Sequence, residues 1–252
     1  MSLQNTTSHK KSLSTDLYIE RPQPEPQFVK NLFGDISKTY DKANDWITFG
    51  MARQWRKSLV EWSDGAQKSQ ILDCATGTGD LAIDFKTALP SAHVIGSDFC
   101  EGMLEYAPQK AKAKKLDILF EVADVTQLPY ADESFDIVSI AYGIRNVLDR
   151  QKAYSEMARV LKPGGRMMIL ETGEVNNPIL KSMIQIYFKN VVPKIGGWIS
   201  GRRDAYEYLQ KSSGIFPSGG QFIEELKNTG FFAQTQFRSL MGGASYIYKA
   251  TK

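Results

Sequence analysis

The chain has 252 residues and a mass of 28.3 kDa, and 42% of its residues are apolar and 23% charged. This composition is that of a globular protein, and the length suits one large α/β domain with an appendage. A formal net charge of +3 is too small to indicate a nucleic-acid partner. Two cysteines provide neither a disulfide framework nor a zinc site, which favours reduced thiols and a cytoplasmic protein without a metal. No apolar run reaches the roughly 18 to 20 residues of a membrane-spanning helix.

The N-terminal region changes character near residue 28. Serine and threonine dominate its first part, and Pro22, Pro24 and Pro26 then alternate with polar residues. Such a segment buries too little apolar surface to offset the entropy of ordering it, so we predict a disordered tail over 1–27. One folded domain is expected over 28–252, and it begins with a helical cap over 28–65.

A glycine-rich turn follows the first apolar strand pattern. The run 71–75 carries Asp73 near its end and leads through Gly77, Thr78 and Gly79 into a helical pattern. A strand, a tight turn and a helix N-terminus are how open α/β sheets bind a nucleotide-like cofactor. The spacing also satisfies a dinucleotide fingerprint, with Asp98 nineteen residues after Gly79. The turn alone therefore leaves NAD and S-adenosylmethionine open.

Strand patterns alternate with helical patterns through the rest of the core. Strands are predicted at Gln70–Ala75, His93–Asp98, Asp117–Ala123, Phe135–Ala141, Arg166–Leu170, Phe231–Phe237 and Ser245–Ala250. Helices are predicted at Asp80–Leu89, Glu101–Lys115, Ala153–Leu161, Asn177–Val192 and Phe222–Asn228. This alternation indicates an α/β fold with a doubly wound, mostly parallel seven-stranded sheet.

Acidic residues stand at the carboxyl ends of the first three strands. Ligands bind outside this edge in open sheets. Asp98 is placed to accept the ribose hydroxyls, and the alternative is a solvated loop acid. Asp124 could accept from an adenine amino group while Val125 offers its backbone amide, and the alternative for Asp124 is a turn or helix cap. An acid beside the glycine turn, such as Asp73, would repel a pyrophosphate but attract an ammonium group, which favours S-adenosylmethionine over NAD.

Several motifs resemble the UbiE/MenG quinone methyltransferases, and the resemblance covers nearly everything after residue 28. The specific motifs are Gly143-Ile144-Arg145-Asn146-Val147 and Tyr206-x-Tyr208-Leu209, and the more general ones are Leu72-Asp73-x-Ala75-x-Gly77-Thr78-Gly79, Leu128-Pro129-Tyr130 and Lys162-Pro163-Gly164-Gly165. The resemblance implies the Rossmann-like class I methyltransferase fold. It also implies C-methylation of a prenylated demethylmenaquinol, or of the related benzoquinol, by S-adenosylmethionine.

The resemblance also suggests cofactor contacts and contains three departures. It implies contacts at Thr78, Asp98, Asp124 and Val125, and we add Asp73, Gly77, Gly79 and Ala141 to the candidate cofactor site. Ala141 stands where some members carry serine. Thr172-Gly173 replaces Phe-Ser after the fifth strand, and Tyr248 replaces a histidine. These departures concern the choice of substrate more than the reaction.

The chemistry itself points to Arg145 and Asn146. A ring carbon attacks a sulfonium methyl only when an ortho hydroxyl gives up its proton, so the enzyme needs a group that favours the phenolate. The two histidines, His9 and His93, are poorly placed to act as the base. We expect Arg145 to stabilise the oxyanion and Asn146 to orient it, with a water molecule as proton acceptor. The alternative for Arg145 is a structural ion pair.

The segment 176–213 is expected to form a helical insertion on the substrate side. It contains an apolar helical stripe, and from 176 to 203 it has five basic residues and no acid. Such a segment can lie on an anionic membrane, but we favour the simpler alternative, a helix packed on its own sheet with its lysines in water. Tyr40, Tyr187 and Tyr206 are candidates to line the channel for a prenylated quinol.

Other functional classes remain open at this point. The enzyme could methylate another lipid or phenolic acceptor, or the chain could be a non-catalytic cofactor-binding scaffold. A homodimer or a quinone-synthesis complex is compatible with the sequence. A nucleic-acid-binding protein is disfavoured, because no aromatic-basic stripe occurs outside 176–203.

Overall fold

The computed structural model describes residues 25–175 and 177–252, so the predicted disordered tail falls outside the described residues up to position 24. Folded structure begins two residues earlier than expected, because Pro26 opens helix α2 (Pro26–Ile47). Proline is favoured in a first helical turn, where its missing N–H is not needed. Gly50, at φ 73°, then turns the chain into α3 (Met51–Trp62), and the two helices form the predicted N-terminal cap.

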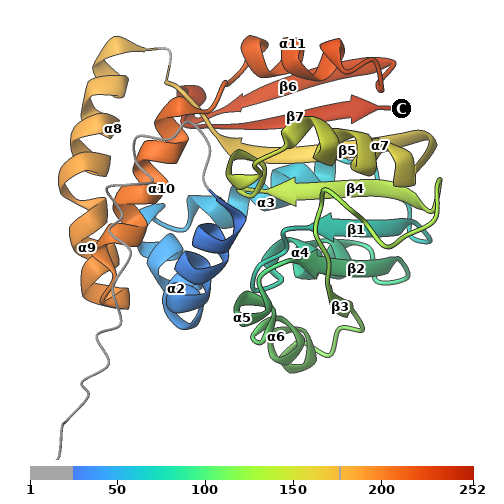
Figure 1. Cartoon of the computed structure of the whole chain (residues 1–252), viewed down its shortest axis with the longest axis horizontal. Helices are drawn as coiled ribbons and strands as arrows, with labels where there is room; N and C mark the ends of the chain where they lie inside the picture. Colours follow the sequence, from blue (N-terminus) through green and yellow to red (C-terminus); the bar gives the residue numbers. More distant parts are fainter. Residues whose placement is uncertain (1–24, 176) are drawn as a thin grey trace, which may run out of the picture.

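The seven strands form one sheet in the order β3-β2-β1-β4-β5-β7-β6 (Figure 1). The first five strands are parallel, and β7 pairs antiparallel with β5 and β6. The strands are β1 (Gln70–Cys74), β2 (His93–Asp98), β3 (Leu119–Val122), β4 (Phe135–Ala141), β5 (Leu161–Thr172), β6 (Gln234–Leu240) and β7 (Ser245–Thr251). The predicted seven-stranded, mostly parallel sheet is confirmed.

Both faces of the inner strands are buried, and neighbouring residues of a strand point to opposite faces. Leu72 and Val138 belong to a core shared with α7 (Arg150–Val160) and α11 (Gly220–Asn228). Ile71 and Ile137 pack instead with α3 and α4 (Asp80–Ala88). This alternation of two apolar faces is what a parallel sheet covered on both sides requires.

Three predicted boundaries are wrong, each for a local reason. The helix expected over 101–115 is two helices, α5 (Glu101–Leu104) and α6 (Ala107–Ala113), because Pro108 can occupy only a first turn. Strand β5 starts five residues early, so Gly164 and Gly165 lie within it and a register shift marks its pairing with β4. Strand β6 lies three residues later than expected.

The insertion consists of α8 (Pro178–Asn190), α9 (Val192–Ser200) and α10 (Arg203–Ile215). Asn177 caps α8 as predicted, since its side chain accepts from the amides of Ile179 and Leu180. We had favoured packing of this segment on the sheet, and the structure differs. Val192 and Tyr206 instead share a core with Leu32 and Ile36 of α2.

The carboxyl ends of β1 and β4 point toward α2 and α10 in Figure 1, so the helical layer stands over the edge where ligands bind. Short 3₁₀ turns at Ile144–Asn146 (η1) and Met241–Gly243 (η2) also lie in this region. Within 25–175 and 177–252, no helix combines the length and apolarity needed to cross a bilayer.

Candidate active site

The glycine turn between β1 and α4 has the conformation that the sequence predicted. Gly77 and Gly79 have φ of 58° and 83°, which residues with a Cβ rarely adopt. A Cβ on Gly79 would also come within 2.9 Å of Ala107 and Phe120. The turn therefore presents backbone N–H groups at the start of α4, the arrangement that open sheets use for nucleotide-like ligands.

Asp73 and Asp98 are buried beneath this turn and fixed by hydrogen bonds. Asp73 accepts from the hydroxyls of Thr76 (2.6 Å) and Ser139 (2.7 Å). Asp98 accepts from the backbone amides of Gly77 (2.8 Å) and Cys100 (2.8 Å). Burial raises the pKa of Asp73 to about 7 and that of Asp98 to about 6, and the hydrogen bonds only partly oppose this shift. Burial thus disfavours the ionised form of both carboxyls.

Asp80, which follows the glycine turn, is neutralised by two cations. Arg56 contacts it at 2.9 Å and Lys110 at 2.5 Å. Burial alone would raise the pKa of Asp80, but these two cations hold it below the ordinary value. The case for an ammonium-binding site beside the turn rests on the buried acids instead.

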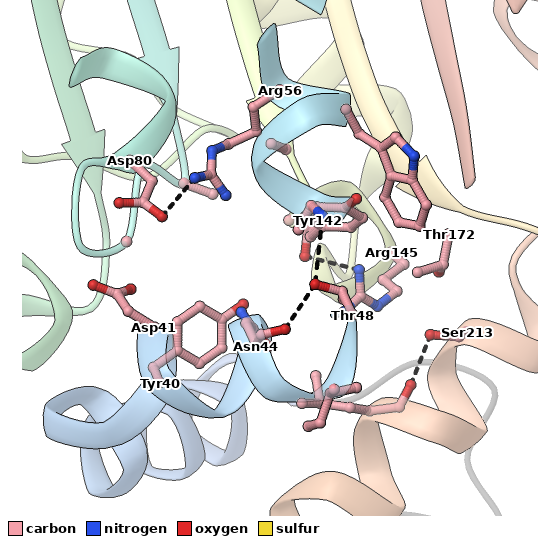
Figure 2. Close-up of a pocket in the computed structure, with 18 of the residues that line it drawn as sticks. Tyr40, Asp41, Asn44, Thr48, Arg56, Asp80, Tyr142, Arg145, Thr172 and Ser213 are labelled. Atoms are coloured by element: carbon pink, nitrogen blue, oxygen red, sulfur yellow. Dashed lines mark hydrogen bonds and ion pairs between the residues drawn. The ribbon is translucent and has the colours of Figure 1, made fainter. Parts of the chain in front are cut away.

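A polar network ties the N-terminal cap to the glycine turn. Asp41 of α2 accepts from Thr78 Oγ1 at 2.6 Å and from Lys110 Nζ at 2.5 Å. Lys110 also reaches Asp80, so a single ammonium group joins α2, α4 and α6. Figure 2 shows Asp41 facing Asp80 across the site, with Arg56 bonded to Asp80 from α3. The sequence offered no sign of the Lys110 contacts, because their partners are distant in the chain.

One cavity of about 410 Å³ opens above the turn, between the sheet edge and the helical layer. Ten of the predicted site residues line it: Tyr40, Asp73, Gly77, Thr78, Asp98, Ala141, Arg145, Asn146, Tyr187 and Tyr206. Apolar side chains from α8 and α10, including Leu180, Ile184 and Leu209, form much of the remaining wall. The cavity therefore joins the buried acids to an apolar compartment.

Asp124 and Val125 are not among the residues that line this cavity. Asp124 is exposed and accepts from the amide and the hydroxyl of Thr126, both at 2.8 Å, so it caps a turn. Val125 is half-buried and packs against the core beneath the sheet edge. The turn cap was the alternative interpretation of Asp124, and an adenine contact for this pair stays a prediction.

Gly79 is also not among the residues that line the cavity. Its positive φ and close neighbours show that it shapes the turn instead.

Arg145 forms the buried ion pair that the sequence left as an alternative. Its Nη1 lies 2.5 Å from Glu171 Oε1 and donates to the carbonyl of Tyr142 at 2.9 Å. The Arg145 side chain is 5% exposed and that of Glu171 is fully buried. Burial lowers the pKa of Arg145, but Glu171, Tyr40 and Tyr208 outweigh this and raise it above its ordinary value. The guanidinium is therefore held in the charged form.

This pair is incompletely satisfied. Arg145 Nε and Glu171 Oε2 are buried and have no hydrogen-bond partner among residues 25–175 and 177–252. Leaving a buried polar group unpaired costs about 1–3 kcal/mol, and more for a charged one. Arg145 is among the residues that line the cavity, so its positive charge favours an anionic ligand oxygen there.

The segment between β4 and α7 positions both Arg145 and Asn146. Tyr142 adopts a φ of 56°, which is uncommon for a residue other than glycine. Asn146 accepts from the Tyr208 hydroxyl at 3.1 Å, which links η1 to α10. The amide nitrogen of Asn146 has only a long 3.5 Å contact with the Tyr142 carbonyl. Asn146 thus keeps donor capacity on the cavity side.

The three predicted tyrosines lie in the helical wall of the cavity. Tyr187 donates to the carbonyl of Ile47 at 3.0 Å, and Phe49 packs on its ring. Tyr206 is fully buried, and its hydroxyl makes no hydrogen bond of standard geometry within 25–175 and 177–252, although the nearby Ser200 hydroxyl partly opposes the effect of burial on its pKa. Burial raises the pKa of Tyr40, and raises that of Tyr206 to about 12, so both hydroxyls stay protonated.

The departures from the family pattern have structural consequences. A Cβ on Gly173 would overlap the ring of Tyr246. The serine of the family pattern would therefore fit at this position only if the Tyr246 ring moved. Tyr246 stacks on Tyr248, whose hydroxyl accepts from the amide of Gly219 at 2.8 Å. Tyr248 is thus a core residue behind the site, while Thr172 lines the cavity itself.

The fold and the site together define a class I S-adenosylmethionine-dependent methyltransferase. The phosphoethanolamine N-methyltransferase 2 of Haemonchus contortus, solved with S-adenosyl-L-methionine, superposes with a TM-score of 0.61 at 17% identity. The match covers 96% of this chain and 61% of that one. The [4+2]-cyclase SpnF superposes with a TM-score of 0.62 at 15% identity, over 92% of this chain and 97% of that one. These structures show the shared fold.

The chain belongs to the ubiE/COQ5 methyltransferase family, whose sequence model matches residues 22–252. It is 50% identical over 228 residues to the ubiquinone/menaquinone biosynthesis C-methyltransferase UbiE of Bdellovibrio bacteriovorus, covering 90% of this chain and 97% of that protein. It is 38% identical over 230 residues to the demethylmenaquinone methyltransferase of Deinococcus radiodurans, covering 91% and 95%. The predictions of a C-methyltransferase and of S-adenosylmethionine as cofactor are confirmed, and NAD is excluded.

Proposed function

We propose that this enzyme transfers the methyl group of S-adenosylmethionine to a ring carbon of a prenylated quinol, converting demethylmenaquinol to menaquinol. Membership of the ubiE/COQ5 family supports this reaction, as do relatives named for menaquinone and ubiquinone biosynthesis. The cavity supports it too, because an apolar compartment adjoins the buried acids of the cofactor site.

The observation that carries the proposal is the buried Arg145–Glu171 ion pair, whose arginine is among the residues that line this cavity. The cofactor supplies an electrophilic methyl group on a sulfonium. An aromatic carbon becomes nucleophilic enough when the ortho hydroxyl is ionised, so stabilising the phenolate lowers the barrier. Arg145 is fixed in its charged form by Glu171 and can donate to that oxygen. Asn146, held by Tyr208, orients the same oxygen.

The proton of the hydroxyl leaves to water in this proposal. His93 is exposed at the start of β2, and the carboxyl end of that strand faces the cavity. His9 lies outside the described residues. Tyr40, Tyr187 and Tyr206 bind the substrate, since all three are among the residues that line the cavity. These contacts fix the ring so that one carbon faces the methyl group.

Anaerobic turnover with labelled S-adenosylmethionine tests the proposal. Reduced short-tail demethylmenaquinone and the matching benzoquinol are offered in parallel, and the methylated products are isolated. Label in the naphthoquinol ring supports the proposal, whereas label only in the benzoquinol assigns the ubiquinone branch. If neither ring is labelled while calorimetry shows cofactor binding, the chain methylates another lipid or phenolic acceptor or acts as a scaffold.

We further propose peripheral contact with the membrane on the cytoplasmic side, because a prenylated quinol is a bilayer lipid. The acid-free segment 176–203 borders the cavity and supports this placement. A homodimer or a quinone-synthesis complex stays a prediction.

A further inference from the structure

Helix α8 exposes an apolar stripe on its outer side. Ile179, Met183 and Ile186 are 75%, 63% and 62% exposed, and their spacing of four and three residues places them on one helical face. Trp198 on the adjoining α9 is 83% exposed. Single exposed apolar residues are ordinary, but a row of them on neighbouring helices marks an interaction surface. Figure 1 shows α8 and α9 at the outer side of the helical layer, away from the sheet.

The same helix forms part of the cavity wall. Leu180, Ile184 and Tyr187 line the cavity, and Met183 both lines it and is exposed. Two further apolar residues both line the cavity and are exposed: Phe49, between α2 and α3, and Met241 in η2. We call Phe49, Met183 and Met241 the apolar rim. Three separate parts of the chain thus place exposed apolar side chains around the opening of the cavity.

The charges beside this surface favour an anionic partner. Among the five basic residues of 176–203, Lys181 pairs with Glu174, Arg202 with Asp204 and Asp35, and Arg203 with Glu207. Lys189 and Lys194 are exposed and form no ion pair with any residue of 25–175 or 177–252. Exposed apolar residues flanked by unpaired lysines are the pattern by which helices bind anionic bilayer surfaces.

The size of the cavity requires the substrate to extend beyond it. Its volume of about 410 Å³ lies near the lower end of the range for pockets that enclose drug-sized ligands. The methyl-donor end of the cofactor and the quinol ring both have to occupy this space. An isoprenoid tail of several units must therefore leave through the opening, past the apolar rim.

We propose that the outer face of α8 and the apolar rim dock into an anionic lipid bilayer, so that the cavity opens directly into the acyl region. The quinol ring then enters the cavity while its tail stays in the membrane. This inference rests on the proposed function, since it takes the substrate to be a lipid. It adds the residues that insert and the orientation of the protein on the membrane.

Vesicle sedimentation tests the docking with the full chain. Vesicles of phosphatidylcholine with and without phosphatidylglycerol are compared. The double variant Ile179→Ser/Ile186→Ser removes apolar surface outside the cavity lining, and Leu119→Ser/Phe231→Ser removes exposed apolar side chains elsewhere as the matched control. The first variant should lose most vesicle binding and the control none. Lys189→Glu or Lys194→Glu should weaken binding to the anionic vesicles by at least about fivefold each.

Turnover separates this inference from the proposed function. The Ile179→Ser/Ile186→Ser variant should methylate a short-tail quinol in solution at the wild-type rate and lose turnover of a long-tail quinol embedded in vesicles. Wild-type protein that fails to bind anionic vesicles overturns the inference even when the short-tail quinol is methylated. A dimer in light scattering that this variant dissociates, with vesicle binding unchanged, assigns the face to a second copy and also overturns it. Vesicle binding without methylation of either quinol refutes the proposed function and leaves the docking in place.

Discussion

The two halves of the active site are built on different principles. Around the glycine turn, Asp73 and Asp98 have each carboxylate oxygen bonded to the protein, and the turn geometry is fixed by positive φ angles. In the helical half, the buried Arg145 Nε has no hydrogen-bond partner in the described part of the chain, and the outer side of α8 is apolar and exposed.

This difference indicates which contacts each half of the site already makes and which it lacks. The cofactor half is preorganised by its own hydrogen bonds, so a ligand adds to a finished scaffold. The substrate half has unmet donors and uncovered apolar surface, so it becomes complete only with a ligand and, as we propose, a lipid surface. Variants and pH changes that perturb one half, with the other half as reference, test this division.

The largest effect is expected for Arg145→Ala. Removing one partner of a buried ion pair leaves Glu171 charged and uncompensated, which should cost about 3–5 kcal/mol of the free energy of unfolding. Turnover should fall by roughly 100- to 1,000-fold with cofactor affinity nearly unchanged, as for loss of an oxyanion donor. Denaturant unfolding, turnover and calorimetry measure these three quantities.

A double variant separates catalysis from stability at this pair. Arg145→Met/Glu171→Met replaces both charges by apolar side chains of similar length and should recover most of the lost stability. It should not recover turnover. A double variant that is both stable and active would show that the ion pair serves only the fold.

The next largest effect is expected for Gly196→Ala in α9. A Cβ there would overlap the ring of Tyr206, so Tyr206 or α9 must move, at a cost of about 1–3 kcal/mol. Gly214→Ala in α10 is the matched control, because nothing lies within 4 Å of its added Cβ. That change should stabilise the protein by up to about 1 kcal/mol, since alanine favours helix over glycine.

The kinetics of the Gly196→Ala and Gly214→Ala variants show whether Tyr206 belongs to the substrate half. Gly196→Ala should raise the KM for the quinol and leave the Kd for the cofactor unchanged, whereas Gly214→Ala should alter neither. Equal changes in both constants would contradict the division of the site into two halves.

The parts of the structure predicted from the sequence are those set by local patterns. Strands β2 and β4 were predicted to the residue, because each apolar run is bounded by turn residues. The glycine turn and its two buried acids followed from their spacing along the chain. In contrast, the break at Pro108 was missed because the helical periodicity on both sides concealed it.

The contacts that the sequence did not reveal join distant segments. Lys110 bonds to Asp41, 69 residues away, and α9 and α10 pack on α2 rather than on the sheet. Periodicity identifies the apolar face of a helix but not which element covers it. The Arg145–Glu171 pair was left open for the same reason, since strand order alone brought β5 beside η1.

The pH dependence of the cofactor half gives a moderate effect with a definite sign. The pKa of Asp98 is about 6 and that of Asp73 about 7, both above the ordinary value near 3.8, because burial disfavours the charged form. Between the unfolded and folded pKa values the native state holds more protons than the unfolded chain. The stability of the cofactor-free enzyme should therefore decrease as pH rises from about 4 to 7, by on the order of 3 kcal/mol for Asp98.

Cofactor affinity should change in the opposite direction. We predict that the ionised carboxylates attract the cationic cofactor and that Asp98 accepts its hydroxyls, so the Kd should decrease between pH 5.5 and 7.5. Asp98→Asn should flatten the pH dependence of unfolding and weaken cofactor binding by about 10- to 100-fold. Calorimetry in two buffers checks the accompanying proton release. Unchanged affinity across this pH range would mean that Asp98 does not contact the cofactor.

The smallest effect is expected for Lys110→Met, at the junction between the halves. The Lys110 side chain is 28% exposed and pairs with Asp41 and Asp80, so its loss should cost no more than about 1 kcal/mol of global stability. Locally the change should be larger, because α2 loses the Lys110 contact and keeps only the Asp41–Thr78 hydrogen bond and its apolar packing against α9. Amide hydrogen exchange should therefore accelerate in the middle of α2 and not in β1 or β4. Lys112→Met, on the same helix and without these partners, is the control, and equal exchange in both variants would show that the Lys110 contact does not hold the cap in place.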